Sequence, residues 1–235
     1  MKTLTRTAVS LGLVFAITLA ACSDDVDKAT EKIQTAKALS DALLTVTDMP
    51  SGWEESQRQV FNTRSMENPS IDPSVWCSQA KATAEPLVDL AGQSGADVEM
   101  SQSRGGNAGA SMMRLQAWSN DDATEYFATA QAAVEKCDNV SSTDESGVST
   151  KTNVIDGRSV GNESVSFSQE TIPPPSTQDE KFSSVSRTSI VRIGSIIMVM
   201  QLGDAGPTGS VQSMDEETWW GYVTQAVDKL EELNN

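Results

Sequence analysis

The residues that could carry chemistry in this chain are three cysteines and several groups of acidic side chains, because the sequence contains no histidine. Histidine is the side chain that most often serves as a general base and as a metal ligand. Its absence excludes catalytic triads built on histidine and zinc sites of the mixed cysteine and histidine type. The cysteines are Cys22, Cys77 and Cys137. Without a neighbouring histidine, none of them is favoured as a nucleophile.

Paired carboxylates are the remaining route to catalysis, since glycoside hydrolysis needs only two acids about 5–10 Å apart. The acidic groups of this chain are Asp24-Asp25, Asp121-Asp122, Asp215-Glu216-Glu217 and Glu231-Glu232. Each is better explained by a solvated tether, by the capping of a helix start or by a solvated helix end. No EF-hand spacing supports a calcium site. The sequence therefore predicts no enzyme, no metal site and no cofactor, and it leaves the ligand-binding residues unknown.

The N-terminal segment predicts export from the cytoplasm. Lys2 and Arg6 precede an apolar run at residues 8–21 that ends in small residues, which is the layout of a secretory signal peptide. A membrane-spanning helix needs about 20 apolar residues, and Ser23-Asp24-Asp25 ends this run too early. The alternative, a buried core helix, would leave the basic start and the small-residue end unexplained.

The end of this signal resembles a bacterial lipobox. Leu19-Ala20-Ala21 stands directly before Cys22, and in that motif the cysteine is lipidated and becomes the mature N-terminus. The resemblance implies that residues 1–21 are removed and that several acyl chains on Cys22 hold the protein firmly to a membrane. The protein would then be anchored to the cell membrane on its extracytoplasmic face. The alternative is plain secretion, with Cys22 incidental.

With Cys22 assigned to lipid, Cys77 and Cys137 remain as a pair in an oxidising compartment. A disulfide between them is the favoured interpretation, and two separate buried thiols are the alternative. The charge balance also limits the partners. The chain has 17 basic and 33 acidic residues, and such an acidic surface repels phosphate backbones, so nucleic acid is not expected as a partner.

The apolar periodicity predicts an α+β fold that positions these residues. Alternation predicts strands at residues 53–61, 96–103, 110–118, 150–155, 163–171, 182–193 and 195–202, with 138–147 as a polar loop. Helical spacing predicts helices at residues 40–44, 72–87, 123–137 and 216–233. Residues 196–200 are apolar on both sides and should lie centrally in the sheet.

We therefore expect a single domain at residues 40–235, preceded by a signal peptide at 1–21 and a polar tether at 22–39. Its antiparallel sheet should have about five to seven strands, with three to four helices packed on it.

Several short segments resemble the PknH-like extracellular sensor domain, found in actinobacterial (mycobacterial-type) lipoproteins and receptor kinases. They are Thr47-Asp48-Met49-Pro50-Ser51-Gly52-Trp53, Trp76-Cys77 with the later Cys137, Val160-Gly161-Asn162-Glu163, and Val191-Arg192-Ile193-Gly194-Ser195-Ile196. Two features depart from the family: Asn162 replaces its usual aspartate, and only one disulfide can form where the kinase ectodomains have two. The resemblance implies a sheet with helices around a cleft and binding of a ligand or partner.

Two functions follow as expectations. The first is a lipid-anchored, sensor-like module that binds an envelope small molecule, a lipid or a protein partner. Its cleft could be lined by tryptophans, namely Trp53, Trp76, Trp118, Trp219 and Trp220. Trp76 and Trp219 have core-like spacing, whereas Trp220 is offset and is expected to be the most exposed. The second is a carrier or accessory protein for envelope lipids, with residues 196–200 lining an apolar cavity.

Overall fold

A central strand that begins with five consecutive apolar residues organises the fold. This strand, β8 (Ile196–Pro207), begins with five buried residues at 196–200. Side chains alternate across a strand, and here the even-numbered residues enter one hydrophobic core while the odd-numbered residues enter another. The sequence prediction of a central strand covered on both faces is confirmed.

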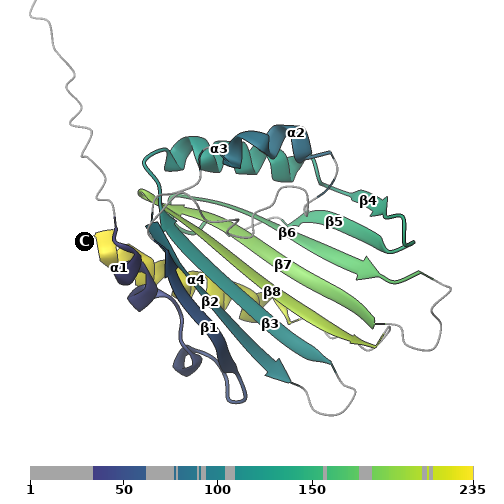
Figure 1. The fold of residues 1–235 in the computed structure, drawn as a ribbon, viewed down its shortest axis with the longest axis horizontal. Helices are drawn as coiled ribbons and strands as arrows, with labels where there is room; N and C mark the ends of the chain where they lie inside the picture. The colour runs from purple at the N-terminus through teal and green to yellow at the C-terminus, as the bar shows by residue number, and fades with distance from the viewer. Residues whose placement is uncertain are drawn as a thin grey trace, which may run out of the picture. The chain divides into compact units, whose positions relative to one another are not determined.

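The computed structural model describes residues 34–61, 77, 79–88, 90, 94–103, 109–155, 158–174, 182–207, 211 and 214–234. Within these residues, eight strands form one antiparallel sheet in the order β1-β2-β3-β8-β7-β6-β5-β4 (Figure 1). Besides β8, the strands are β1 (Glu54–Phe61), β2 (Ser94–Ser103), β3 (Ala110–Ser119), β4 (Val140–Thr143), β5 (Ser149–Ile155), β6 (Glu163–Ile172) and β7 (Phe182–Ile193). The predicted signal peptide and Cys22 lie outside the described residues.

The strand count corrects the prediction of about five to seven. The additional strand is β4, whose residues fall in the segment predicted as a polar loop. It has only four residues and pairs with β5 alone, at the edge of the sheet. Three of its four residues are exposed, so the strand has no need of apolar residues on one face. Its sequence, Val-Ser-Ser-Thr, shows no alternation of apolar and polar residues, and periodicity could not reveal the strand.

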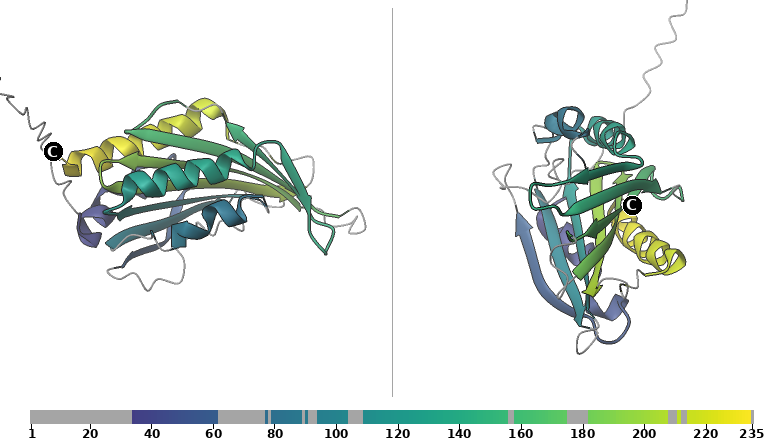
Figure 2. Two further views of the ribbon diagram at one scale, coloured as in Figure 1. Left: turned by 90° about the horizontal axis from the view of Figure 1, so that it is seen from above. Right: turned by 90° about the vertical axis from the view of Figure 1, so that its right-hand side faces the viewer.

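Helices cover both faces of the sheet. One face, called here the α4 face, packs against α1 (Ala36–Ala42) and α4 (Glu216–Glu231). The other, the α3 face, packs against α2 (Lys81–Ala84) and α3 (Ala123–Glu135) (Figure 2). Short 3₁₀ turns occur at Val46–Asp48, Glu85–Val88 and Glu232–Asn234. The α+β class is therefore confirmed, and the four α-helices of the described residues agree with the prediction.

Two helices differ from the predicted ranges. In the described residues of the helix predicted at 72–87, the α-helix covers Lys81–Ala84 and continues as a 3₁₀ turn at Glu85–Val88. Pro86 has no backbone N–H, so it cannot donate to the carbonyl four residues earlier, and the α-helical pattern ends. Its predicted start at residues 72–73 lies outside the described residues. The first helix begins at Ala36 rather than at residue 40, with Thr35 as its N-cap.

The domain starts earlier than the predicted residue 40. Leu39 is fully buried, and the chain is already attached to the sheet at Gln34. The Gln34 backbone N–H donates to Ser119 Oγ at 3.0 Å, and Ser94 Oγ donates to the Gln34 carbonyl at 2.8 Å. The described chain is therefore packed against the sheet from Gln34 onward. The polar composition of the residues before position 40 led to their prediction as a tether. Burial here does not follow residue type, since Ser40 is buried although serine is polar.

Candidate ligand-binding site

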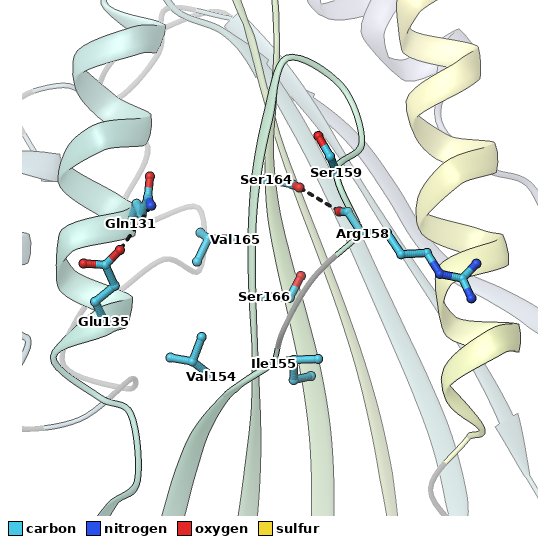
Figure 3. Close-up of a pocket in the computed structure, with 9 residues that line it drawn as sticks. All are labelled: Gln131, Glu135, Val154, Ile155, Arg158, Ser159, Ser164, Val165 and Ser166. Atoms are coloured by element: carbon cyan, nitrogen blue, oxygen red, sulfur yellow. Dashed lines mark hydrogen bonds between the residues drawn. The ribbon is translucent and has the colours of Figure 1, made fainter.

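A small cavity lies at a step in the sheet between β5 and β6. The last paired residue of β5, Ile155, is opposite Ser166, so the first three residues of β6 extend beyond it. The cavity has a volume of about 280 Å³ and lies beside α3 (Figure 3). Its lining residues are Gln131, Glu135, Val154, Ile155, Arg158, Ser159, Ser164, Val165 and Ser166.

Local hydrogen bonds hold the polar groups of this cavity in place. On α3, the Gln131 amide donates to Glu135 Oε1 at 3.1 Å, one helical turn apart. On the opposite wall, Ser164 Oγ donates to the carbonyl of Arg158 at 3.0 Å, which fastens the segment before β6 to that strand. Figure 3 shows both bonds on either side of Val165. The cavity is therefore built from a helix, two strands and a tethered loop.

The Arg158 guanidinium is directed away from α3 (Figure 3) and forms an ion pair with Glu217 on α4. The hydrogen bond and the charge of Arg158 lower the pKa of Glu217, and the same partner raises the pKa of Arg158. Among the described residues of the lining, Glu135 supplies a carboxylate, and Gln131 and Ser159 supply further groups that can exchange hydrogen bonds with a small polar molecule.

The predicted acidic groups have structural roles where the structure describes them. Asp215 is the N-cap of α4, and its Oδ1 accepts from the Thr218 backbone N–H at 2.9 Å. These Thr218 hydrogen bonds lower the pKa of Asp215. Asp122 occupies the N-cap position of α3 without a side-chain capping hydrogen bond, and its backbone N–H donates to Asn120 Oδ1 at 2.8 Å. Glu231 and Glu232 are exposed at the end of α4, and Asp24-Asp25 lies outside the described residues.

Among the described residues, no three acidic or cysteine side chains come close enough together to hold a metal ion. No helix in the same part of the chain is long and apolar enough to span a membrane.

The tryptophans do not line a cleft in the described part of the chain. Trp118, Trp219 and Trp220 are at most 2% exposed, and Trp53 is 7% exposed. The prediction that Trp220 is the most exposed was wrong. The apolar stripe of α4 is wide enough to bury two adjacent residues, because this helix packs on a broad sheet. Trp76 lies outside the described residues.

A disulfide joins Cys77 to Cys137, with 5.7 Å between their Cα atoms. Cys77 lies before α2, and Cys137 follows the end of α3. Both are buried in the core of the α3 face. The bond therefore connects the two segments that cover this face, 60 residues apart in sequence.

The segments that carry the family resemblance make structural contacts. Asp48 bridges the turn before β1 to α4: its Oδ2 lies 2.6 Å from Lys229 Nζ, and its Oδ1 accepts from Gln225 at 3.1 Å. The backbone N–H of Thr45 also donates to this carboxylate, at 2.8 Å. Burial opposes ionisation of Asp48, but the Lys229 and Thr45 hydrogen bonds outweigh it and lower its pKa.

The other two segments contact each other. The Asn162 backbone N–H donates to the carbonyl of Arg192 at 2.9 Å, and its side-chain oxygen accepts from Gly194 N–H at 2.6 Å. Gly161 has a φ of +62°, and a Cβ there would lie 2.7 Å from the Arg192 carbonyl oxygen. These residues fasten the loop before β6 to the β7–β8 hairpin.

Replacing Asp48 with asparagine is expected to lower the free energy of unfolding by about 2 kcal/mol at neutral pH. The variant loses the partly buried ion pair with Lys229 and weakens the capping hydrogen bond with Thr45. The pKa of Asp48 is lower in the folded protein than in the unfolded chain. The carboxylate therefore stabilises the fold at pH values above the pKa that Asp48 has in the unfolded chain. This contribution is lost as the pH falls through the folded pKa. The difference between variant and wild type, measured by urea unfolding, should therefore shrink between pH 7 and pH values below about 4.

Asp41→Asn provides the control for this experiment. Asp41 pairs with Lys37 on the surface of α1, with 64% and 82% of the two side chains exposed. Such a pair contributes at most about 0.5 kcal/mol. Equal losses of stability for Asp41→Asn and Asp48→Asn would contradict a bridging role for Asp48.

No known protein-family model matches this chain, and no curated protein is similar to it in sequence. Among solved structures, it is similar to the extracellular domain of PknH from Mycobacterium tuberculosis. The TM-score is 0.51 at 10% sequence identity, over 86% of this chain and 99% of that domain. At this identity the likeness shows a shared fold. The sequence-based prediction of a PknH-like architecture is thus confirmed at the level of the fold.

Proposed function

We propose that this chain is a lipid-anchored, extracytoplasmic binding module of the cell envelope, with a sensor-like domain tethered through Cys22. The observation that carries the proposal is the disulfide between Cys77 and Cys137, together with an N-terminal segment whose sequence has the layout of a secretory signal. Disulfides persist in oxidising compartments and are rare in the cytosol. The fold shared with an extracellular domain supports the same location.

The proposed ligand of the cavity is a small polar molecule with an apolar portion. Ser159 and the Gln131–Glu135 pair offer donors and acceptors, and Val154, Ile155 and Val165 provide apolar contact. A volume of about 280 Å³ lies at the lower end of the range for small-molecule sites. The lipid-carrier alternative depended on residues 196–200 lining an apolar cavity, and these residues are instead buried in the two cores.

Removing the lipidation site is expected to release the protein from the membrane. In a Cys22→Ala variant the signal can no longer receive its acyl chains, and firm attachment requires at least two of them. We expect at least a tenfold rise in the ratio of soluble to membrane-bound protein after cell fractionation. Retention of the variant in the membrane fraction would contradict anchoring through Cys22. Cys77→Ala, which leaves the anchor intact, should remain in the membrane fraction.

Native mass spectrometry tests the cavity. Protein purified from its own envelope is expected to carry an additional small mass. Ser159→Tyr should abolish that mass, because Ser159 is an exposed residue of the cavity wall and a larger side chain would fill the space. Ser141→Tyr on the exposed surface of β4 is the matched control. A bound lipid, or equal binding by both variants, would contradict this assignment.

A further inference from the structure

The C-terminal end of α3 brings negative charge to the cavity between β5 and β6. Glu135 is the last residue of this helix and one of the residues that line the cavity. The 13-residue helix also carries a partial negative charge at its C-terminal end, from the aligned dipoles of its peptide groups. The carboxylate and the helix dipole therefore have the same sign at this wall, and both favour a cation.

A second carboxylate lies directly behind the lining. Asp138 Oδ1 accepts the backbone N–H of Val154, a lining residue, at 3.0 Å. Its Oδ2 accepts from the Asn139 side-chain amide at 2.9 Å. Both of these donors are neutral groups. Asp138 thus adds a second negative charge one hydrogen bond away from the cavity wall.

The cationic side chain of the described lining is turned away from the space. The Arg158 guanidinium is directed away from α3 and pairs with Glu217 on α4 (Figure 3). The hydrogen bond from Ser164 Oγ to the Arg158 carbonyl, at 3.0 Å, holds the backbone of this residue. Lys136 follows Glu135 in sequence, but it lies about 100° further around the helix axis and is not among the described lining residues. In this part of the chain, the negative charge of Glu135 therefore meets no cation directed into the cavity.

The charge of the whole chain acts in the same direction. The sequence has 17 basic and 33 acidic residues, and its formal net charge is −16. A surface of one sign raises the local concentration of ligands of the opposite sign and repels ligands of its own sign. An anionic ligand would be repelled both by this field and by Glu135, whereas a cation is attracted by both.

Glu135 can accept hydrogen bonds from a ligand while it keeps its partner on the helix. The Gln131 amide donates to Glu135 Oε1 at 3.1 Å and so orients the carboxylate. An ionised carboxylate offers about four lone-pair sites, and an ammonium group has three donors. Hydrogen bonds between such charged groups are about twice as strong as those between neutral groups. The pair of Gln131 and Glu135 is therefore suited to hold an ammonium group.

The walls on the strands are suited to a short aliphatic chain. Val154, Ile155 and Val165 contribute branched aliphatic side chains to the lining. Val165 is buried in the core of the α3 face, and Val154 packs against that core. The cavity volume of about 280 Å³ limits the ligand to a small molecule. One cationic group on a short aliphatic chain would match both kinds of wall.

We propose that the cavity binds a small organic amine in its protonated form. The ammonium group would lie at Glu135, and the aliphatic portion would contact Val154, Ile155 and Val165. This ligand class rests on the proposed function, since it concerns the same cavity and names the chemistry of its ligand. A neutral molecule of the same shape should bind more weakly than the amine, and an anion should not bind.

Saturation-transfer NMR of the full chain in neutral detergent micelles tests the proposal, with protein-free micelles as the blank. The probes are pentylamine, pentanol and pentanoate, which share a five-carbon chain and differ in charge. We expect pentylamine to bind at least tenfold more tightly than pentanol, and pentanoate to show no binding. Raising the salt concentration from about 50 mM to about 500 mM should weaken pentylamine binding several-fold and leave pentanol unaffected, because salt screens charge.

Glu135→Gln keeps the shape of the side chain and removes its charge. This variant should lower the affinity for pentylamine to the level of pentanol and should leave pentanol binding unchanged. Glu125→Gln is the matched control, since Glu125 lies in the first turn of the same helix, about 15 Å from Glu135 along the axis. It should bind all three probes as wild type does. Both variants should keep the wild-type unfolding temperature within a few degrees.

The outcomes separate the ligand class from the cavity itself. Equal binding of pentylamine and pentanol, tighter binding of pentanoate, or unchanged pentylamine binding by Glu135→Gln would overturn the cationic assignment and leave the small-molecule cavity in place. Binding of none of the probes, by a protein that still carries a small mass from its own envelope, would do the same. Binding of none of the probes together with the absence of that mass would overturn both.

Discussion

Replacing both Cys77 and Cys137 with alanine is expected to lower the free energy of unfolding by about 4 kcal/mol. The bond closes a loop of 60 residues, and the loss of chain entropy in the unfolded state grows with the length of such a loop. For a domain of this size, that loss corresponds to a fall in melting temperature of about 10 °C. Thermal unfolding followed by circular dichroism measures it directly.

Reduction of the wild-type protein provides the control for this double variant. A reducing agent should lower the wild-type melting temperature by a similar amount and should leave the variant unchanged. The disulfide joins the segments around α2 and α3, so hydrogen exchange should rise first in these helices. A wild-type protein whose melting temperature is insensitive to reduction would show that the two cysteines are not bonded, and it would remove the main support for an oxidising compartment.

Replacing Trp220 with alanine is expected to lower the free energy of unfolding by about 4 kcal/mol, from lost apolar burial and the cavity left behind. Trp220 is fully buried in the core between α4 and the sheet. In the described residues its indole N–H is buried without a hydrogen-bond partner, as are those of Trp118 and Trp219. Burial of an unpaired donor carries a cost of its own.

Trp220→Phe separates these two effects. Phenylalanine keeps an aromatic ring in the core and removes the unpaired N–H, so part of the packing loss is offset. We expect a loss of about 1–2 kcal/mol for this variant, well below that of the alanine variant. Urea unfolding of both proteins gives the comparison. Equal losses would contradict the packing described here, and a negligible loss for alanine would mean that Trp220 is exposed in solution.

The sequence predicted most of the fold where apolar periodicity was strong. The two-sided apolar residues 196–200 and the stripe of α4 identified a central strand and a covering helix, because burial on a defined face leaves a regular pattern. Apolar periodicity failed where a strand is short and exposed or where a buried residue is polar. Strand β4 is a four-residue exposed edge, and Ser40 is buried within α1. Trp220 was misplaced because a helix on a broad sheet buries more than one stripe.

The candidate site could not be predicted from the sequence, because strand pairing brings its residues together. Ile155 and Ser166 of the cavity are adjacent on β5 and β6 only through the register of these strands, and a shift by one residue would reverse the faces to which the side chains point. The cavity combines Glu135 from α3 with Ser164 from β6. By contrast, the anchoring motif at Cys22 is local in sequence, so a short segment is enough to suggest it.

We propose that this domain is held outside the cytoplasm by lipid on Cys22. The most direct measurement is mass spectrometry of the N-terminal peptide and of the cysteine-containing peptides, prepared without reduction from membranes of cells that express the full chain. The account predicts a mature chain that begins at Cys22 and carries a diacylglyceryl group, together with a linked pair of peptides containing Cys77 and Cys137. A chain that still begins at Met1, or an unmodified Cys22, would contradict it.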